Sequence, residues 1–202
     1  MVDKNKSIHK LNFLPPIYYL NLDGQPERKK YVEDHFAHWG IKNYTRISAY
    51  DGRNDDLSDI IKGRYPEQMT SGEVGCTTSH LKAIKHWYDT SDSAYALIME
   101  DDIDLSIVRC WNFSWNEFMA NLPYDWDVVA DDLIYNSGNT YSIPLFLYKL
   151  ELGSSIHPEH IDAIHKGNKE GQFNWWQQEG SKYSIKDLMD YDPYLGRVSP
   201  QE

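Results

Sequence analysis

Short apolar runs alternate with amphipathic segments along the first hundred residues. Residues 17–22 are rich in aromatic and branched side chains and follow two prolines, which predicts a buried strand. Between residues 27 and 39 the apolar positions recur at helical spacing and Gly40 follows, which predicts a helix that ends there. A second strand is predicted over residues 45–49. Two strand–helix units in succession favour an α/β fold.

A second helix is predicted from residue 70 to about residue 88. Thr70 and Glu73 have the capping-box spacing, in which each side chain satisfies a free backbone amide at a helix start. The apolar stripe of this helix comprises Thr77, Leu81, Ile84 and Tyr88. We expect that face to pack on the sheet. A third strand is predicted over residues 94–99.

Three further elements are expected later in the chain: a helix over 111–122, a strand over 126–130 and a short helix over 158–165. The composition becomes polar from residue 167 onward. We therefore expect a polar lead-in over 1–14, an α/β domain over 15–166 and a loosely structured tail over 167–202.

Composition excludes several classes of protein. With 202 residues, 41% of them hydrophobic and 25% charged, the chain is expected to fold as a globular protein. A formal net charge of -11 argues against a nucleic-acid partner, which requires a basic face. The two cysteines lack metal or redox spacing and are interpreted as reduced thiols. No apolar run has the length of a membrane span or a signal peptide, so we expect a soluble, cytoplasmic protein.

An acidic cluster directly follows the third predicted strand. In open α/β sheets ligands bind at the carboxyl ends of the strands, which is where Glu100, Asp101 and Asp102 are expected. If the segment stays extended, Glu100 and Asp102 point to one side and Asp101 to the other. Two convergent carboxylates suit Mg²⁺ or Mn²⁺. A solvated strand end or a set of helix caps gives the same pattern, so both interpretations stay open.

Four motifs follow one another along the first half of the chain. They are YYLNLD at 18–23 with Arg28, AYDG at 49–52, EVGCTTSHLKAI at 73–84 and ALIMEDDIDL at 96–105. Together, and in this order, these motifs resemble glycosyltransferase family 25, which includes lipooligosaccharide and collagen galactosyltransferases.

The resemblance implies a GT-A-like fold, a mixed sheet flanked by helices, whose donor half would span residues 15–127. It implies a metal-dependent hexosyltransferase that moves galactose or glucose from a UDP-sugar to a hydroxyl of a glycan or lipooligosaccharide. Mn²⁺ or Mg²⁺ would be held by Asp102 and Glu100. The implied donor-binding residues are Leu20, Asn21, Arg28, Asp51, Ser79, His80 and Asp101.

Asp131 and Asp132 resemble the later acidic position of the family and join Glu100 in the implied catalytic group. Either aspartate would serve as the base that deprotonates the acceptor hydroxyl in an inverting reaction. The same pair also suits a helix start. Two other positions have alternative readings: Arg28 would be an exposed residue in the first turn of a helix, and His80 a hydrogen-bonded structural residue.

The chain departs from the family after Trp126-Asp127, where members carry a further strand and helix before the later acid. A shortened acceptor region leaves a second hypothesis open: a non-catalytic member that binds a nucleotide-sugar or a glycan. Two weaker hypotheses are a sugar-stacking tryptophan platform and a zinc site without a nearby cysteine. The residues concerned are Trp111, Trp115, Trp175 and Trp176 for the platform, and His157, His160 and His165 for zinc.

Overall fold

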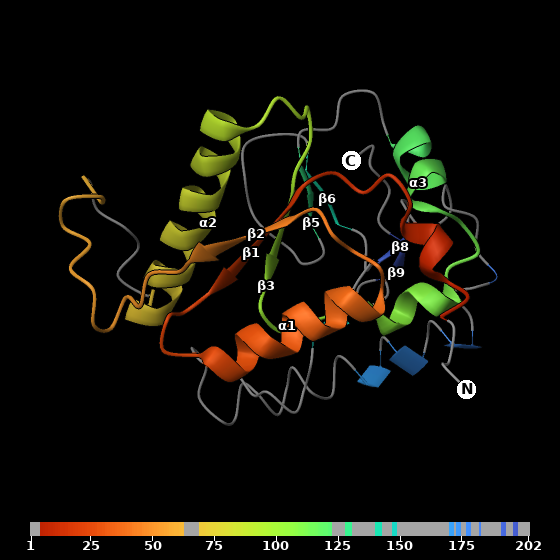
Figure 1. Ribbon diagram of the computed structural model, residues 1–202, viewed down its shortest axis with the longest axis horizontal. Helices are drawn as coiled ribbons and strands as arrows, with labels where there is room; N and C mark the ends of the chain where they lie inside the picture. The colour runs from red at the N-terminus through yellow and green to blue at the C-terminus, as the bar shows by residue number, and fades with distance from the viewer. Residues whose placement is uncertain are drawn as a thin grey trace. The chain divides into compact units, whose positions relative to one another are not determined.

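The fold is that of an α/β protein, seen in the computed structural model of Figure 1. Residues 15–103 contribute to one compact unit, and residues 1–14 and 104–148 to a second. The structure describes residues 5–62, 69–122, 128–130, 140–142, 147–148, 170–171, 173–174, 177–178, 182, 191–192 and 196–197.

A parallel three-stranded sheet forms the centre of the first unit. β1 (Ile17–Asn21) lies between β2 (Tyr44–Ser48) and β3 (Leu97–Glu100), and both neighbours run parallel to it. All five β1 side chains are buried, as expected for the central strand of a sheet covered on both faces. The three predicted strands are therefore confirmed, with boundaries shifted by one to three residues.

The two helices of this unit cover opposite faces of the sheet (Figure 1). Side chains alternate along β1, so Tyr19 contacts Phe36 of α1 (Pro26–His38), whereas Tyr18 contacts His86 of α2 (Ser71–Thr90). The chain steps from β1 to one edge strand and then back across to the other. Right-handed crossovers in opposite directions place their helices on opposite faces. The carboxyl ends of β1 and β3 thus form the switch point at which such sheets bind ligands.

Helix α1 follows its sequence prediction closely. Pro26 stands at its first position, where the missing amide hydrogen costs nothing. The helix ends before Gly40, whose φ of 69° is the left-handed conformation that glycine adopts readily. Val32 and Phe36 are fully buried. Burial of each such side chain contributes about 1.5–3 kcal/mol.

Helix α2 begins at the predicted capping box, but it packs through a different face. Thr70 Oγ1 accepts from the Glu73 amide, and Glu73 Oε2 accepts from the Thr70 amide. The expected apolar stripe is wrong: Leu81 is 61% exposed and Tyr88 81% exposed. The buried face instead carries small residues, Gly72, Gly75, Thr78, Ser79 and Ala83. Small side chains allow the helix backbone to approach the sheet and the adjoining loop more closely than Leu or Tyr would.

The closest of these approaches joins α2 to the loop after β2. A methyl group on Gly75 would lie 2.7 Å from the Tyr50 carbonyl oxygen and still closer to the Gly52 amide nitrogen. A methyl group on Gly52 would in turn lie 2.8 Å from the Gly75 nitrogen. Both neighbours are backbone atoms, which have little freedom to move. The two glycines are therefore required by the close contact itself.

The second unit has a separate aromatic core. Its elements include η1 (Ile8–Leu11), η2 (Leu105–Cys110) and α3 (Trp115–Asn121), and β4 (Ile103–Asp104) leads into them. The helix expected over 111–122 begins only at Trp115, because Ser114 and Glu117 form a capping box there. Trp111 and Trp115 are buried. Trp111 stacks on Phe113 with ring centroids 4.9 Å apart, so these two tryptophans are core residues and no sugar platform.

Short strands follow beyond residue 122: β5 (Val128–Ala130), β6 (Thr140–Ser142), β7 (Leu147–Tyr148), β8 (Tyr191–Asp192) and β9 (Gly196–Arg197). β5 falls within the strand expected over 126–130 and pairs in parallel with β6. Outside the described residues lie the helix expected over 158–165, the three histidines considered as zinc ligands, and Trp175 and Trp176. Among the described helices, none combines the length and apolar character needed to cross a membrane.

Replacing Gly75 with alanine should destabilise the protein. Alanine favours a helix interior over glycine by about 1 kcal/mol, but overpacking against fixed backbone costs about 1–3 kcal/mol and dominates when no atom can yield. We expect a lower urea midpoint and a thermal midpoint that falls by about 2–4 °C per kcal/mol. Gly24→Ala is the matched control, because nothing lies within 4 Å of its added methyl. Equal stability of the two variants would contradict the tight contact.

Candidate functional site

A pocket lies at the carboxyl edge of the sheet in the first unit. Side chains from the ends of β1 and β3, from the loop after β2, and from α1 and α2 line it. Among its lining residues are Asn21, Arg28, Asp51, Cys76, Glu100 and Asp101. A second hollow shares the wall made by Tyr50 and Asp51 and extends to Lys82. The two hollows share part of their lining and are together called the groove below.

Arg28 is buried beneath the acidic motif. Its Nε donates to Asp101 Oδ1 at 2.7 Å, and its Nη2 donates to Asp102 Oδ2 at 2.8 Å. Burial alone would lower the pKa of Arg28, but the two carboxylates outweigh it and raise that pKa. Arg28 is therefore charged. Because it is only 7% exposed, its interpretation as an exposed first-turn residue is excluded.

Asn21 and Asp101 tie the ends of β1 and β3 together. Asn21 Nδ2 donates to Asp101 Oδ2 at 2.6 Å and to the Gln25 carbonyl at 3.1 Å, and Asn21 Oδ1 accepts from Arg46 Nε at 2.9 Å. Asn21 is 2% exposed and Asp101 6% exposed. Both side chains thus use their hydrogen-bonding groups inside the protein, where they fix the position of the acidic motif.

The expected alternation of the acidic side chains stops at Glu100. β3 ends there and residues 101–102 form a turn, so Asp101 and Asp102 both reach Arg28 while Glu100 contacts α2. The alternation was expected only for an extended backbone, and the backbone turns at residues 101–102. Burial and the negative charge of Glu100 raise the pKa of Asp102 to about 6.

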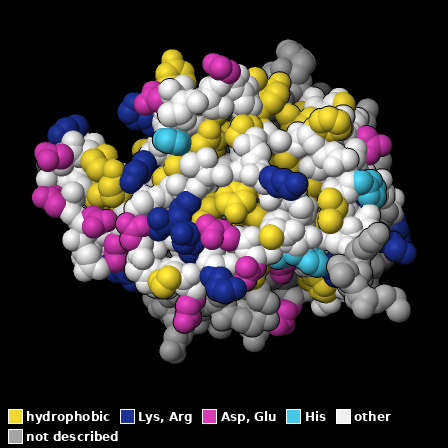
Figure 2. All heavy atoms as spheres, in the orientation of Figure 1, with side chains coloured by type: hydrophobic (Ala, Val, Ile, Leu, Met, Phe, Trp, Pro, Cys, Tyr) yellow, Lys and Arg dark blue, Asp and Glu magenta, His cyan; other side chains and the backbone are white. Residues whose placement is uncertain are grey.

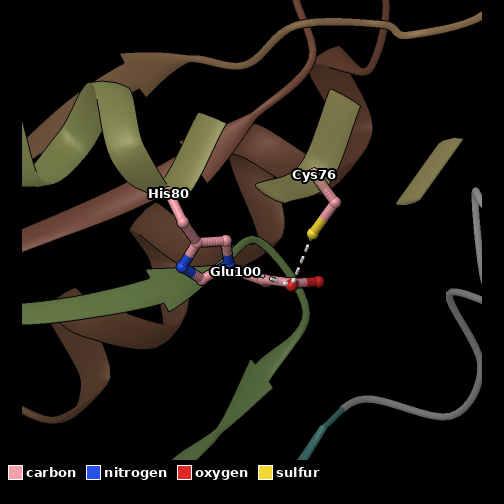
Figure 3. Close-up of side chains that lie close together, drawn as sticks. All are labelled: Cys76, His80 and Glu100. Carbon is pink, nitrogen blue, oxygen red and sulfur yellow. Dashed lines mark hydrogen bonds and ion pairs between the residues drawn. The ribbon is translucent and has the colours of Figure 1, made fainter. Parts of the chain in front are cut away.

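Glu100 faces two residues of α2 that are one helical turn apart (Figure 3). Cys76 Sγ donates to Glu100 Oε1 at 3.3 Å, and His80 Nε2 lies 3.3 Å from the same oxygen. The contact with His80 holds the pKa of Glu100 below its usual range. Burial and the charge of Glu100 raise the pKa of the Cys76 thiol. The three groups offer one sulfur, one nitrogen and one oxygen ligand, all within 4.8 Å of one another.

The loop after β2 forms the other wall of the pocket. Asp51 accepts from Arg53 Nε and Asn54 Nδ2, each at 2.8 Å, and these hydrogen bonds lower the pKa of Asp51 to about 2. The Ser79 hydroxyl donates to the Gly75 carbonyl at 2.6 Å and accepts from the Tyr50 amide at 2.8 Å. The ionised Asp51 shapes the loop, and buried Ser79 holds the loop against α2.

The structure brings nearly all of the expected residues to this one edge. Leu20 lines the pocket, although its side chain also belongs to the core cluster with Tyr18 and Ile47. Asp131 and Asp132 lie outside the described residues. Cys76 was expected only as a reduced thiol. Its spacing of four residues from His80 on a predicted helix was the available signal.

An ion pair and a cation–π contact lie at the rim of the groove. Arg46 Nη2 lies 2.5 Å from Asp23 Oδ1, and Lys82 Nζ lies 4.4 Å from the centre of the Tyr50 ring. On the face drawn in Figure 2, acidic and basic side chains stand beside one another with hydrophobic side chains between them. Basic groups are thus present at the groove despite the net negative charge of the chain.

Comparison with known families identifies the class of protein. The family described as "Glycosyltransferase family 25 (LPS biosynthesis protein)" matches residues 14–123, more than half of the chain. The chain belongs to this glycosyltransferase family, and its α/β fold agrees with a nucleotide-sugar transferase. Searches of curated proteins and of solved structures give no match. The family match ends before Trp126, consistent with a shortened member, and leaves Asp131 and Asp132 as predictions.

Two neighbouring acids should respond differently to the same substitution. Asp101→Asn places an amide opposite the donors of Asn21 and Arg28, and loss of these buried hydrogen bonds should cost about 1–3 kcal/mol. Asp102→Asn should cost less, because the partly buried charge that it removes is disfavoured there. Urea unfolding with a chelator at neutral pH measures both. A larger loss for Asp102→Asn would contradict this assignment.

Proposed function

We propose that the chain is a metal-dependent hexosyltransferase that uses a UDP-sugar donor, galactose or glucose, and a hydroxyl acceptor on a glycan or lipooligosaccharide. The observation that carries the proposal is the position of the family's acidic motif. Glu100 ends a parallel strand at the switch point of the sheet, where nucleotide ligands bind in such folds, and Asp101 and Asp102 follow directly in a turn. Family membership supports the reaction class, and a cytoplasmic location stays a prediction.

The acidic motif suits a divalent cation. Asp102 is a carboxyl group whose charge is disfavoured by burial and by nearby Glu100. A cation shared by these two carboxylates would remove that penalty, and hard oxygen ligands fit Mn²⁺ or Mg²⁺. We propose that Asp102, with Glu100, holds the ion. A bound ion would supply positive charge that offsets the negative charge of the departing nucleotide diphosphate.

The other residues of the edge would position and neutralise the donor. Arg28 adds a buried positive charge to the motif, and its two carboxylate contacts orient the acids. Asn21 and Asp101 keep the ends of β1 and β3 at a fixed distance. Because that pair is fully engaged inside the protein, we assign it a positioning role in donor binding.

The groove wall would receive the nucleoside. Asp51 stays ionised and lies beside both hollows, where its oxygens would accept from a uracil or ribose group. Ser79 holds the loop that carries Asp51. His80 contacts Glu100, which lines the pocket. We propose Asp131 or Asp132 as the base that removes the proton of the acceptor hydroxyl, with Glu100 as the further catalytic carboxylate.

Substitution of Asp102 tests the enzymatic proposal. We expect Asp102→Asn to abolish UDP release and hexose transfer measured with UDP-galactose or UDP-glucose and Mn²⁺. The matched control is Asp34→Asn, which removes an exposed carboxylate of α1 that pairs with Lys30. Asp34→Asn should retain activity. Unchanged turnover in Asp102→Asn would refute the role of the motif.

Binding without turnover separates the enzyme from the non-catalytic alternative. Ligands that bind only the folded state stabilise it, by about 2.7 kcal/mol at a hundredfold excess over Kd. We expect UDP with Mn²⁺ to raise the thermal midpoint of the wild-type protein, and UDP with chelator to raise it less. The same shift without hydrolysis or transfer would support a nucleotide-sugar-binding member that lacks activity. Absence of any shift would contradict both.

A further inference from the structure

We propose that Cys76, His80 and Glu100 form a binding site for a metal ion of the zinc class. Its thiol and imidazole ligands distinguish it from the Mn²⁺ position proposed at Asp102, although the two share Glu100. The proposal rests on the three side chains drawn in Figure 3, which converge from α2 and the end of β3. Nothing in the proposed transfer reaction uses the thiol or the imidazole as a metal ligand. The site therefore goes beyond that function, and its test needs no turnover.

The spacing of the ligand atoms fits one tetrahedral ion. Zinc bonds of about 2.3 Å to sulfur and about 2.0–2.2 Å to nitrogen and oxygen place neighbouring tetrahedral ligands about 3.4–3.6 Å apart. Glu100 Oε1 lies 3.3 Å from Cys76 Sγ and 3.3 Å from His80 Nε2, and the three atoms lie within 4.8 Å of one another. Small side-chain rotations would complete the geometry. The fourth position would be left to solvent.

The donor set selects the class of ion. Thiolate and imidazole are ligands of zinc and similar transition metals, whereas Mg²⁺ and Mn²⁺ favour oxygen. Only one of the three groups is a carboxylate, and both recorded contacts use its Oε1 atom. Glu100 therefore supplies one oxygen to this site, and its second oxygen takes part in neither of these contacts. Metal binding would release the thiol proton to the solvent.

The backbone that presents these ligands is held in place on both sides. Cys76 and His80 are one turn apart on α2, so their side chains share a helix face. The residues that precede Cys76 and His80 hold the helix in place. Gly75 packs against the loop after β2, and buried Ser79 accepts a hydrogen bond from the Tyr50 amide. Glu100 pairs in register with Leu20 of the central strand. A preorganised site of this kind loses little freedom when it binds an ion.

Cobalt spectroscopy on the full chain tests the proposal. Protein stripped with a chelator should bind Co²⁺ with a thiolate-to-metal charge-transfer band in the near ultraviolet, and the band should disappear when Zn²⁺ displaces the Co²⁺. Cys76→Ser should abolish the band and weaken Zn²⁺ binding by more than about tenfold, since even loss of an outer hydrogen-bond partner of a ligand costs that much. His80→Gln should weaken Zn²⁺ binding and provides a second variant with the thiol intact.

Two matched variants serve as controls. Cys110→Ser removes the other cysteine, which lies in η2, and should leave the band unchanged. Asp102→Asn should also keep the band, although it is expected to abolish transfer, so failure of the transferase proposal and failure of this one are distinguishable. Circular dichroism verifies that each variant is folded. Absence of the band in folded wild-type protein, its persistence in Cys76→Ser, or its loss in Asp102→Asn would overturn the zinc-class site.

Discussion

The fork of Arg28 with Asp101 and Asp102 is the interaction on which the carboxyl edge of the sheet depends. A guanidinium removed from water carries a desolvation cost of several kcal/mol, and it is tolerated only where paired charges and hydrogen bonds compensate. Here the carboxylates of Asp101 and Asp102 compensate the desolvation of Arg28, and Asn21 donates a further hydrogen bond to Asp101. The start of α1 and the ends of β1 and β3 are joined by this network. Its geometry turns the acidic motif and leaves Glu100 facing α2.

On the face of the sheet that α2 covers, the determining feature is a close contact between backbones. Gly75 and Gly52 bring α2 against the loop after β2, and Ser79 closes the contact with a hydrogen bond to the Tyr50 amide. That approach places Cys76 and His80 next to Glu100. The hydrogen-bond network of Arg28 therefore fixes Asp101 and Asp102 from the side of α1. The steric contact of Gly75 with the loop after β2 fixes the neighbouring residues of α2. The pocket is the space that these two constraints leave open.

Stability and function oppose each other within the acidic motif. Asp101 is satisfied by buried donors, whereas Asp102 bears a charge that its surroundings disfavour. A carboxylate such as Asp102, whose charge is disfavoured, weakens the folded state at neutral pH. A cation bound to such a carboxylate would remove this destabilisation. Of these two adjacent residues, Asp101 is held by buried donors of the fold, and Asp102 is the one proposed to bind the cation.

Local patterns in the sequence determined the strands, the capping box of α2, the end of α1 at Gly40, and the family resemblance that places acids at a strand end. These features depend on neighbours within a few positions, so they are readable from the chain alone. Which face of α2 is buried was decided by tertiary packing, because backbone clearance favoured Gly75 and Ser79 over the more hydrophobic Leu81 and Tyr88. The burial of Arg28 and the meeting of Cys76, His80 and Glu100 were likewise decided there. They join residues 20 to 74 positions apart, whose proximity arises only when β3 pairs with β1 and the two helices close on opposite faces.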